Sequence, residues 1–158
     1  MALREIVKNN NDFLSKKSRS VDVIDDRIVE LVNDMKDTLV KARGVGLAAP
    51  QVGVLKRVFI VDVGDEEQSE MIEFINPKII KTKGKNDKYI EGCLSYPGRS
   101  FKIVRPHKVT IEAQNIKGDW FTMEAEDFIA RALMHENDHL DGITIPQIGK
   151  EVFEWWKI

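Results

Sequence analysis

Apolar residues recur at helical spacing in the segment from Asp25 to Ala42. Most are three or four positions apart, which places them on one face of an amphipathic helix. Aspartates open the segment, Lys41 lies near its end, and Gly44 follows as a helix stop. The pattern therefore predicts a helix over residues 25–42, close to the N-terminus. Its apolar face consists of Ile28, Leu31, Val32, Met35, Leu39 and Ala42.

A second helical pattern extends from Glu124 to Asp141. Acidic residues open it and Gly142 follows it, as the helix dipole and helix capping favour. We therefore predict a second helix over residues 124–141, and it carries the residues with the most distinctive chemistry.

Between these two segments the pattern becomes that of β-strands. Val58–Val63 and Met71–Ile75 are runs of β-branched and aromatic residues, which favour strands. The second run ends at Asn76-Pro77, where proline would break a central strand. We therefore predict two short strands here.

A β-hairpin is predicted further along the chain. Lys108–Gln114 alternates apolar and polar residues, Asn115–Asp119 forms a turn, and Trp120–Met123 returns as a strand. Lys81–Lys88 is polar and cationic, and we expect a solvated loop because runs of charge usually lie in solvent. Helices combined with such strands indicate an α+β domain.

Composition and charge place the chain among ordinary globular proteins. Its 158 residues suffice for one domain, so we expect a single domain over residues 1–158. The net charge of −2 provides no basic field for nucleic acid or for an anionic membrane. The longest uncharged stretch, Gly44–Leu55, is too short and too polar to span a membrane, which indicates a functional loop.

The N-terminus and the cysteine content indicate the compartment. The first ten residues carry charges and lack the apolar core of a signal peptide. The single cysteine, Cys93, cannot form a disulfide within the chain. We therefore expect a cytoplasmic protein.

The second predicted helix contains a His-Glu-x-x-His motif. His135 and His139 are four residues apart, so both imidazoles lie on one helix face and can reach one metal ion, with Glu136 beside it. The alternative is an ordinary amphipathic helix whose polar face happens to hold two histidines. The spacing favours a metal site.

A catalytic metal site usually has a third protein ligand. Downstream of the motif, only Asp141, Glu151 and Glu154 offer a carboxylate. Cys93 is the stronger candidate, because thiolates bind such metals tightly and Gly92 lets the backbone come close. Without the helix motif, a lone cysteine is more often an inert buried residue.

Three segments, in this order, resemble the motifs of the peptide deformylase family. The resemblance covers nearly the whole chain, from Met1 to about Gly142. It implies an α+β fold in which antiparallel β-sheets pack around a central metal-binding helix. The motif segments are Gly44-Val45-Gly46-Leu47-Ala48-Ala49-Pro50-Gln51-Val52-Gly53, Glu91-Gly92-Cys93-Leu94-Ser95 and His135-Glu136-Asn137-Asp138-His139-Leu140-Asp141-Gly142.

The resemblance implies an activity and a cofactor. Such enzymes remove the formyl group from the N-terminal methionine of nascent proteins. Cys93, His135 and His139 would hold one divalent metal per chain, natively iron(II), although the same ligands suit zinc, nickel or cobalt. The partner is then an N-formylmethionyl nascent peptide, with transient ribosome contact and the oligomeric state left open.

The resemblance also implies roles in catalysis. Glu136 would take a proton from the attacking water and pass one to the departing amine. The Gln51 side chain and the Leu94 backbone N–H would stabilise the oxyanion. Standing alone, Gln51 would be interpreted as a surface loop amide.

Residues that contact the substrate and residues that orient the site are expected nearby. Val45, Phe128 and Ala132 could form an apolar pocket for methionine, with core packing as the alternative. Arg105 could join Glu91 and Asp138 in a buried charge network, or could lie on the surface. The expected substrate-contacting residues are Val45, Gly46, Gly92, Phe128, Arg131 and Ala132.

Two other functions share these features. A peptidase with the same helix motif would need a third histidine or a carboxylate ligand downstream, and a binding protein could keep the metal site without activity. The tail Lys150–Ile158 has no net charge, so the basic C-terminal helix by which some relatives dock on ribosomes is not expected. Trp155 and Trp156 are expected to pack on the domain, and His107 to be a loop histidine.

Overall fold

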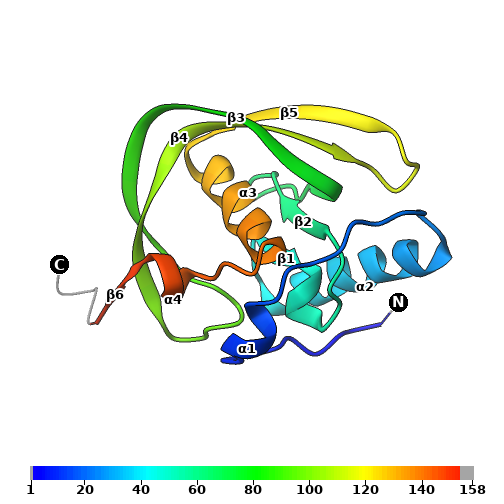
Figure 1. The fold of residues 1–158 in the computed structure, drawn as a ribbon, viewed down its shortest axis with the longest axis horizontal. Coiled ribbons are helices and arrows are strands. Elements are labelled where there is room, and N and C mark those ends of the chain that lie inside the picture. The colour runs from blue at the N-terminus through cyan, green and yellow to red at the C-terminus, as the bar shows by residue number, and fades with distance from the viewer. Residues whose placement is uncertain (1, 154–158) are drawn as a thin grey trace.

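A computed structural model describes residues 2–153 of the chain. It combines helices with a curled antiparallel sheet (Figure 1). The elements in chain order are α1 (Asn11–Leu14), α2 (Asp26–Ala42), β1 (Gly46–Ala48), the 3-10 helix η1 (Ala49–Val52), β2 (Val58–Asp62), β3 (Met71–Glu91), β4 (Ser100–Gln114), β5 (Trp120–Glu126), α3 (Asp127–Leu140), α4 (Ile145–Ile148) and β6 (Lys150–Val152).

Within the described residues the strands form one sheet, whereas we expected more than one. Its order is β1-β2-β3-β4-β5, and β6 pairs with β4. The long strands β3 and β4 arch around α3, which lies inside the curl (Figure 1). No helix in this part of the chain is both long and apolar enough to cross a membrane.

Strand β2 lies between the two long helices. Val58 and Ile60 share one apolar cluster with the buried face of α2, whereas Phe59 and Val61 share another with α3. Successive residues of a strand point to opposite faces, so both faces of β2 are buried. This explains why its sequence is a continuous apolar run.

Helix α2 begins where the sequence predicts. The Asp25 side chain accepts hydrogen bonds from the backbone N–H groups of Arg27 and Ile28, which caps the first turn. Its C-terminal cap is Arg43, with a φ of 56°, and not the expected Gly44.

The two predicted interruptions of β3 are wrong. The strand continues past Pro77 because the register shifts between Ile75 and Lys78, and Asn76 takes a φ of 51° at this bulge. The segment 81–88 is not a loop: it pairs with β4 through two further register shifts. Its lysines are exposed, so the prediction that this segment faces solvent is correct, whereas the prediction of a loop is wrong.

Three smaller expectations also need correction or fall outside the described residues. Helix α3 starts at Asp127, because Glu124–Glu126 continue β5 as partners of β4. The Gly44–Leu55 loop contains the ordered elements β1 and η1. Trp155 and Trp156 lie outside the described residues.

Candidate metal centre

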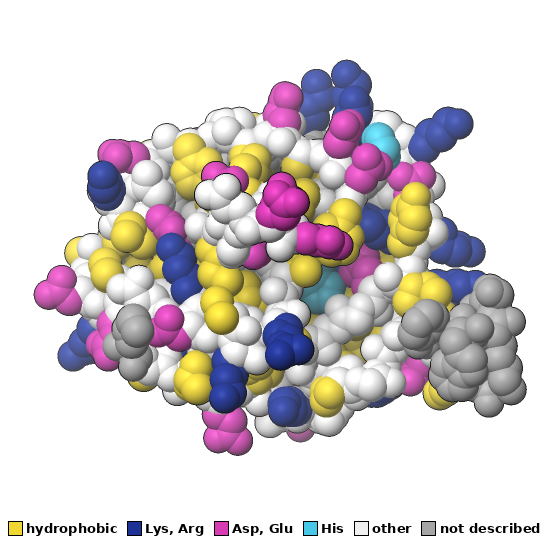
Figure 2. Space-filling model, turned by 180° about the vertical axis from the view of Figure 1, so that it is seen from behind, with side chains coloured by type: hydrophobic (Ala, Val, Ile, Leu, Met, Phe, Trp, Pro, Cys, Tyr) yellow, Lys and Arg dark blue, Asp and Glu magenta, His cyan; other side chains and the backbone are white. Residues whose placement is uncertain are grey.

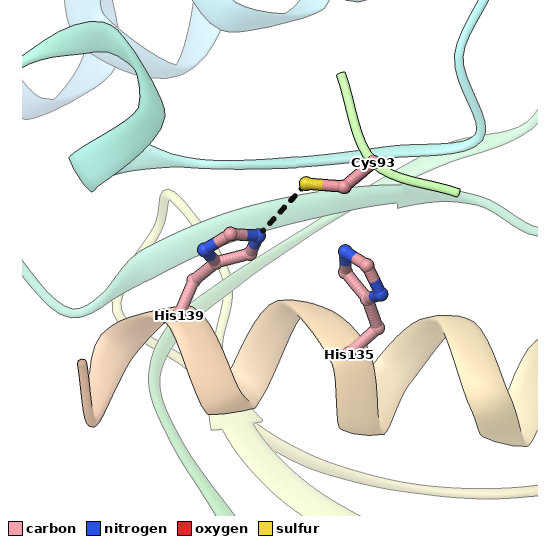
Figure 3. A group of neighbouring side chains, drawn as sticks. All are labelled: Cys93, His135 and His139. Carbon is pink, nitrogen blue, oxygen red and sulfur yellow. Dashed lines mark hydrogen bonds between the residues drawn. The ribbon is translucent and has the colours of Figure 1, made fainter. Parts of the chain in front are cut away.

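Three potential metal ligands converge from two parts of the chain. His135 and His139 lie one turn apart on α3 and face Cys93, which lies in the loop between β3 and β4 (Figure 3). The Cys93 Sγ atom is 3.4 Å from Nε2 of His139. One ligand atom from each residue lies within 4.8 Å of the other two. The structure thus brings together the three residues that the sequence singles out as ligands.

The surroundings of this cluster fit a divalent metal. One thiol and two imidazoles are a donor set that zinc, iron and related metals accept. Burial lowers the pKa of His139 well below its usual value, which favours the neutral, ligating form. The Oε1 atom of Glu136 is buried without a hydrogen-bond partner among the described residues, which leaves a place for a polar ligand beside the cluster.

A buried charge network orients His135. Its Nδ1 lies 2.9 Å from Glu91 Oε1, which leaves Nε2 free for a metal. Arg105 donates two hydrogen bonds to Glu91, at 2.6 and 3.1 Å, and one to Asp138, at 2.9 Å. Burial opposes ionisation of Glu91, but hydrogen bonds from His135 and Arg105 outweigh it and lower the Glu91 pKa to about 2. Arg105 is therefore buried, and not on the surface.

Glu136 lies next to the three candidate ligands. Its Oε2 atom is 3.9 Å from Nε2 of His135, and burial raises its pKa to about 7. The backbone of β1 passes so close that a Cβ atom at Gly46 would lie 2.7 Å from the Glu136 carboxylate. Only glycine fits at this position without displacing Glu136.

Two hydrogen-bond donors lie on the other side of the cluster. The Oε1 atom of Gln51 accepts from the Ala48 N–H at 2.9 Å, so its Nε2 donates to Ser95 Oγ at 3.0 Å and faces Cys93 Sγ at 3.6 Å. For the Leu94 N–H, no acceptor is found within residues 2–153. The Gln51 amide is thus held against Cys93 and Ser95, and the neighbouring Leu94 N–H is a donor without an acceptor among the described residues.

A pocket of about 820 Å³ opens beside these groups. Figure 2 shows this face, with a histidine side chain at the bottom of a hollow. Val45 and Phe128 contribute partly exposed apolar surface to the wall. All six residues expected to contact substrate line the pocket: Val45, Gly46, Gly92, Phe128, Arg131 and Ala132.

Arg131 lines this pocket but its guanidinium is held by the protein. It donates to the backbone carbonyls of Asp87 and Ile103, and it lies 4.9 Å from the centre of the Tyr89 ring. It therefore ties α3 to both β3 and β4.

Sequence reasoning missed part of the pocket wall. Tyr89 and Ile90 directly precede Glu91, and they would have been found had 81–88 been recognised as a strand leading into the cysteine loop. Pro97 and Gly98, which are typical of turns, could likewise have indicated that the chain turns beside Cys93 and lines the site. The missed lining residues are Tyr89, Ile90, Tyr96, Pro97, Gly98, Arg99, Ser100 and Asp127.

His107 belongs to a different cluster. Its Nδ1 lies 3.0 Å from both Asp87 and Asp127, which together form a second group of potential ligands. The side chains of His107 and Asp127 are 31% and 66% exposed. His107 lies in β4, so the expectation of a loop histidine is wrong.

The sequence is similar to those of peptide deformylases over nearly its whole length. The family model of polypeptide deformylases matches residues 3–151. A peptide deformylase of Natranaerobius thermophilus is 46% identical over 97% of this chain and 96% of its own length. A peptide deformylase of Clostridium botulinum is 52% identical over 90% of this chain and 93% of its own length.

Solved structures give the same result. A peptide deformylase of Ehrlichia chaffeensis in complex with actinonin superposes with a TM-score of 0.89, at 34% identity, over 99% of this chain and 92% of that one. A peptide deformylase of Legionella pneumophila superposes with a TM-score of 0.87, at 39% identity, over 93% of this chain and 86% of that one. This chain and the solved peptide deformylases therefore share a fold of helices with a curled antiparallel sheet.

Proposed function

Since the chain belongs to the peptide deformylase family, which removes the N-formyl group from nascent proteins, we propose how its residues perform this hydrolysis. Cys93, His135 and His139 hold the metal on which the reaction depends. The convergence of their ligand atoms within 4.8 Å is the observation that carries the proposal. Helix α3 is then the central metal-binding helix of the fold. The native metal is iron(II), and zinc, nickel or cobalt would suit the same ligands.

Glu136 moves the protons in this proposal. A divalent metal, when bound, supplies Lewis acidity and lowers the pKa of a water. The buried Glu136 carboxyl, with a pKa of about 7, is matched to accept a proton from that water and to donate one to the departing amine. Its unpartnered Oε1 is the atom available for this exchange.

The oxyanion is stabilised by donors that are already in place. Gln51 Nε2 and the Leu94 N–H lie on the cysteine side of the site, where developing negative charge on the formyl oxygen would need them. The Ala48 N–H fixes the direction of the Gln51 amide before any substrate arrives. Such preorganised donors favour the transition state over the ground state.

The apolar pocket would hold the methionine side chain. Val45, Phe128 and Ala132 supply its apolar surface, and Gly46 and Gly92 let a peptide backbone lie close. Arg131 would border the peptide at the wall of this pocket, where two of its guanidinium nitrogens donate to backbone carbonyls and its Nε lies 3.6 Å from Glu91 Oε2.

The domain boundaries, the compartment and the substrate of the enzyme follow from the same assignment. We infer one catalytic domain over residues 1–158, which the family match over residues 3–151 supports. The enzyme acts in the cytoplasm on N-formylmethionyl nascent peptides. Deformylase activity is favoured over a peptidase or an inactive binding protein, because the relatives are named as deformylases and Glu136 and Gln51 are both present.

Formate release tests the proposal. Protein purified without oxygen should liberate formate from a formyl-methionyl peptide and carry one metal per chain. Cys93→Ala, His135→Ala and His139→Ala should each reduce metal content together with activity. Full metal content in all three variants would overturn the ligand assignment while leaving the family unchanged.

A further inference from the structure

The segment before α1 runs along the molecule in extended form and is anchored on α2 (Figure 1). The Ala2 N–H and the Arg4 guanidinium contact the Asp34 carboxylate at 3.1 and 2.9 Å. The Arg4 N–H donates to Thr38 Oγ1 at 2.9 Å. Residues 2–4 are therefore fixed before the segment reaches the active site.

Val7 and Asn9, which we together name the N-terminal clip, then bridge two loops of the site. The Val7 N–H donates to the backbone carbonyl of Gln51 at 2.7 Å, and the Asn9 N–H donates to that of Ser95 at 2.8 Å. Gln51 belongs to η1, and Ser95 lies two residues after Cys93. Backbone N–H groups at alternate residues of an extended segment point to the same side, which lets one segment hold both loops.

The same two loops are joined by two side-chain hydrogen bonds from Gln51 Nε2, one to Cys93 Sγ at 3.6 Å and one to Ser95 Oγ. Gln51 Nε2 donates to Ser95 Oγ at 3.0 Å, and both residues are almost fully buried. Together with the clip, this bond closes a ring of contacts through Val7, Gln51, Ser95 and Asn9. A shift of either loop would therefore break backbone bonds as well as the side-chain bonds.

We propose that Val7 and Asn9 are positioning residues for deformylation, because the clip fixes the distance between the Gln51 amide and the Leu94 N–H. This inference rests on the roles proposed above for those two donors. Oxyanion stabilisation depends on donor placement, so loosening the clip lowers kcat without removing a group that touches substrate or metal.

Asn9 offers a way to test the clip without altering its N–H. Its φ of 55° lies in the left-handed region, which asparagine and glycine tolerate and a β-branched residue resists. Its side chain is exposed and forms no hydrogen bond within the described part of the chain. Substitutions at position 9 therefore act through the backbone.

Asn9→Val and Asn9→Gly form a matched pair. Asn9→Val should lower kcat roughly 10-fold, as the cost of a β-branched residue in the left-handed region implies, with KM and metal content unchanged. Asn9→Gly should retain the activity of the unmodified enzyme. Lys8→Val, which adds the same side chain at an exposed neighbour with ordinary φ, should also retain it. Should Asn9→Val not fold, Asn9→Ala carries the same test with a smaller loss, roughly 3-fold.

A double variant separates positioning from general loosening of the fold. If the clip acts through Gln51, Asn9→Val should reduce kcat much less than 10-fold in a Gln51→Ala background. An equal loss in both backgrounds, or an equal loss in Asn9→Gly, would overturn the proposal. Unchanged kcat in Gln51→Ala would refute the oxyanion assignment itself, whereas unchanged kcat in Asn9→Val beside an impaired Gln51→Ala would refute the clip alone.

Discussion

Two histidines of this chain make almost the same contact in opposite surroundings. His135 Nδ1 lies 2.9 Å from Glu91, and His107 Nδ1 lies 3.0 Å from Asp87. The side chains of the first pair are each 9% exposed, whereas those of the second are 31% and 32% exposed. The contact alone does not distinguish a candidate metal centre from a surface cluster.

The difference lies in what surrounds each pair. Glu91 is held by two hydrogen bonds from the buried Arg105, which is held in turn by Asp138. Around His107 the further carboxylates belong to the exposed Asp127 and Glu126. Removing one partner of a solvent-exposed ion pair costs little stability, because water solvates the remaining charge. Removing one partner from the buried network costs more, because the remaining charges stay poorly solvated.

Glutamine substitution of one glutamate from each region should give the largest difference. Glu136→Gln keeps the size of the side chain and removes the acid/base group, so kcat should fall by about 10² to 10⁴. Metal content should stay at one per chain. The control, Glu126→Gln in the exposed cluster, should leave kcat unchanged, as steady-state formate release can measure. Loss of metal in Glu136→Gln would indicate a coordinating role instead.

Methionine substitution of two cations on β4, one in each region, should lower the free energy of unfolding by different amounts. Arg105→Met leaves the buried Glu91 and the half-buried Asp138 without this partner, so the free energy of unfolding should fall by about 3 to 5 kcal/mol. Lys108→Met removes an exposed ion pair with Glu126 and should cost no more than about 1 kcal/mol.

Urea denaturation of the metal-free proteins provides the comparison for these two variants. Metal-free protein is required because metal binding would add its own stabilisation to the folded state. Similar costs for Arg105→Met and Lys108→Met would mean that burial does not set the difference between the regions.

Metal content should also respond to only one region. Cys93→Ala removes a soft ligand and should lower metal content several-fold after dialysis. His107→Ala, in the second group of potential ligands, should leave it unchanged because Asp127 is too exposed to hold a metal firmly. Metal analysis of both variants after the same dialysis makes the comparison. A drop with His107→Ala would show that the exposed cluster binds metal too.

The sequence predicted elements best where periodicity and capping agree. The α2 stripe and its Asp25 cap belong to one continuous segment, so local pattern sufficed. β3 was predicted only in part, because a proline and a lysine run locally oppose a strand. Its register shifts and its pairing with β4 are long-range features that no local pattern reveals.

The candidate site was predictable for a different reason. His135 and His139 are brought together by helix geometry alone. The approach of Cys93 depends on the whole sheet, so thiol chemistry and the resemblance indicated this residue but no local pattern placed it beside the helix. The Arg131 contacts with backbone carbonyls could not be read from residue types, since any acceptor along β3 or β4 would have served.

The smallest effect is expected within the exposed ribbon of β3 and β4. Lys83 pairs directly with Lys108 in the register, and like charges at opposed positions destabilise a sheet slightly. Lys83→Gln should therefore raise the free energy of unfolding by a few tenths of a kcal/mol, and about 0.5 M NaCl should abolish the gain by screening. Lys85→Gln is the matched control, because Lys85 falls within a register shift and opposes no residue. If Lys83→Gln lowers the free energy of unfolding and Lys85→Gln does not, Lys83 makes a stabilising contact. The exposed ribbon would then resemble the buried network more than its exposure suggests.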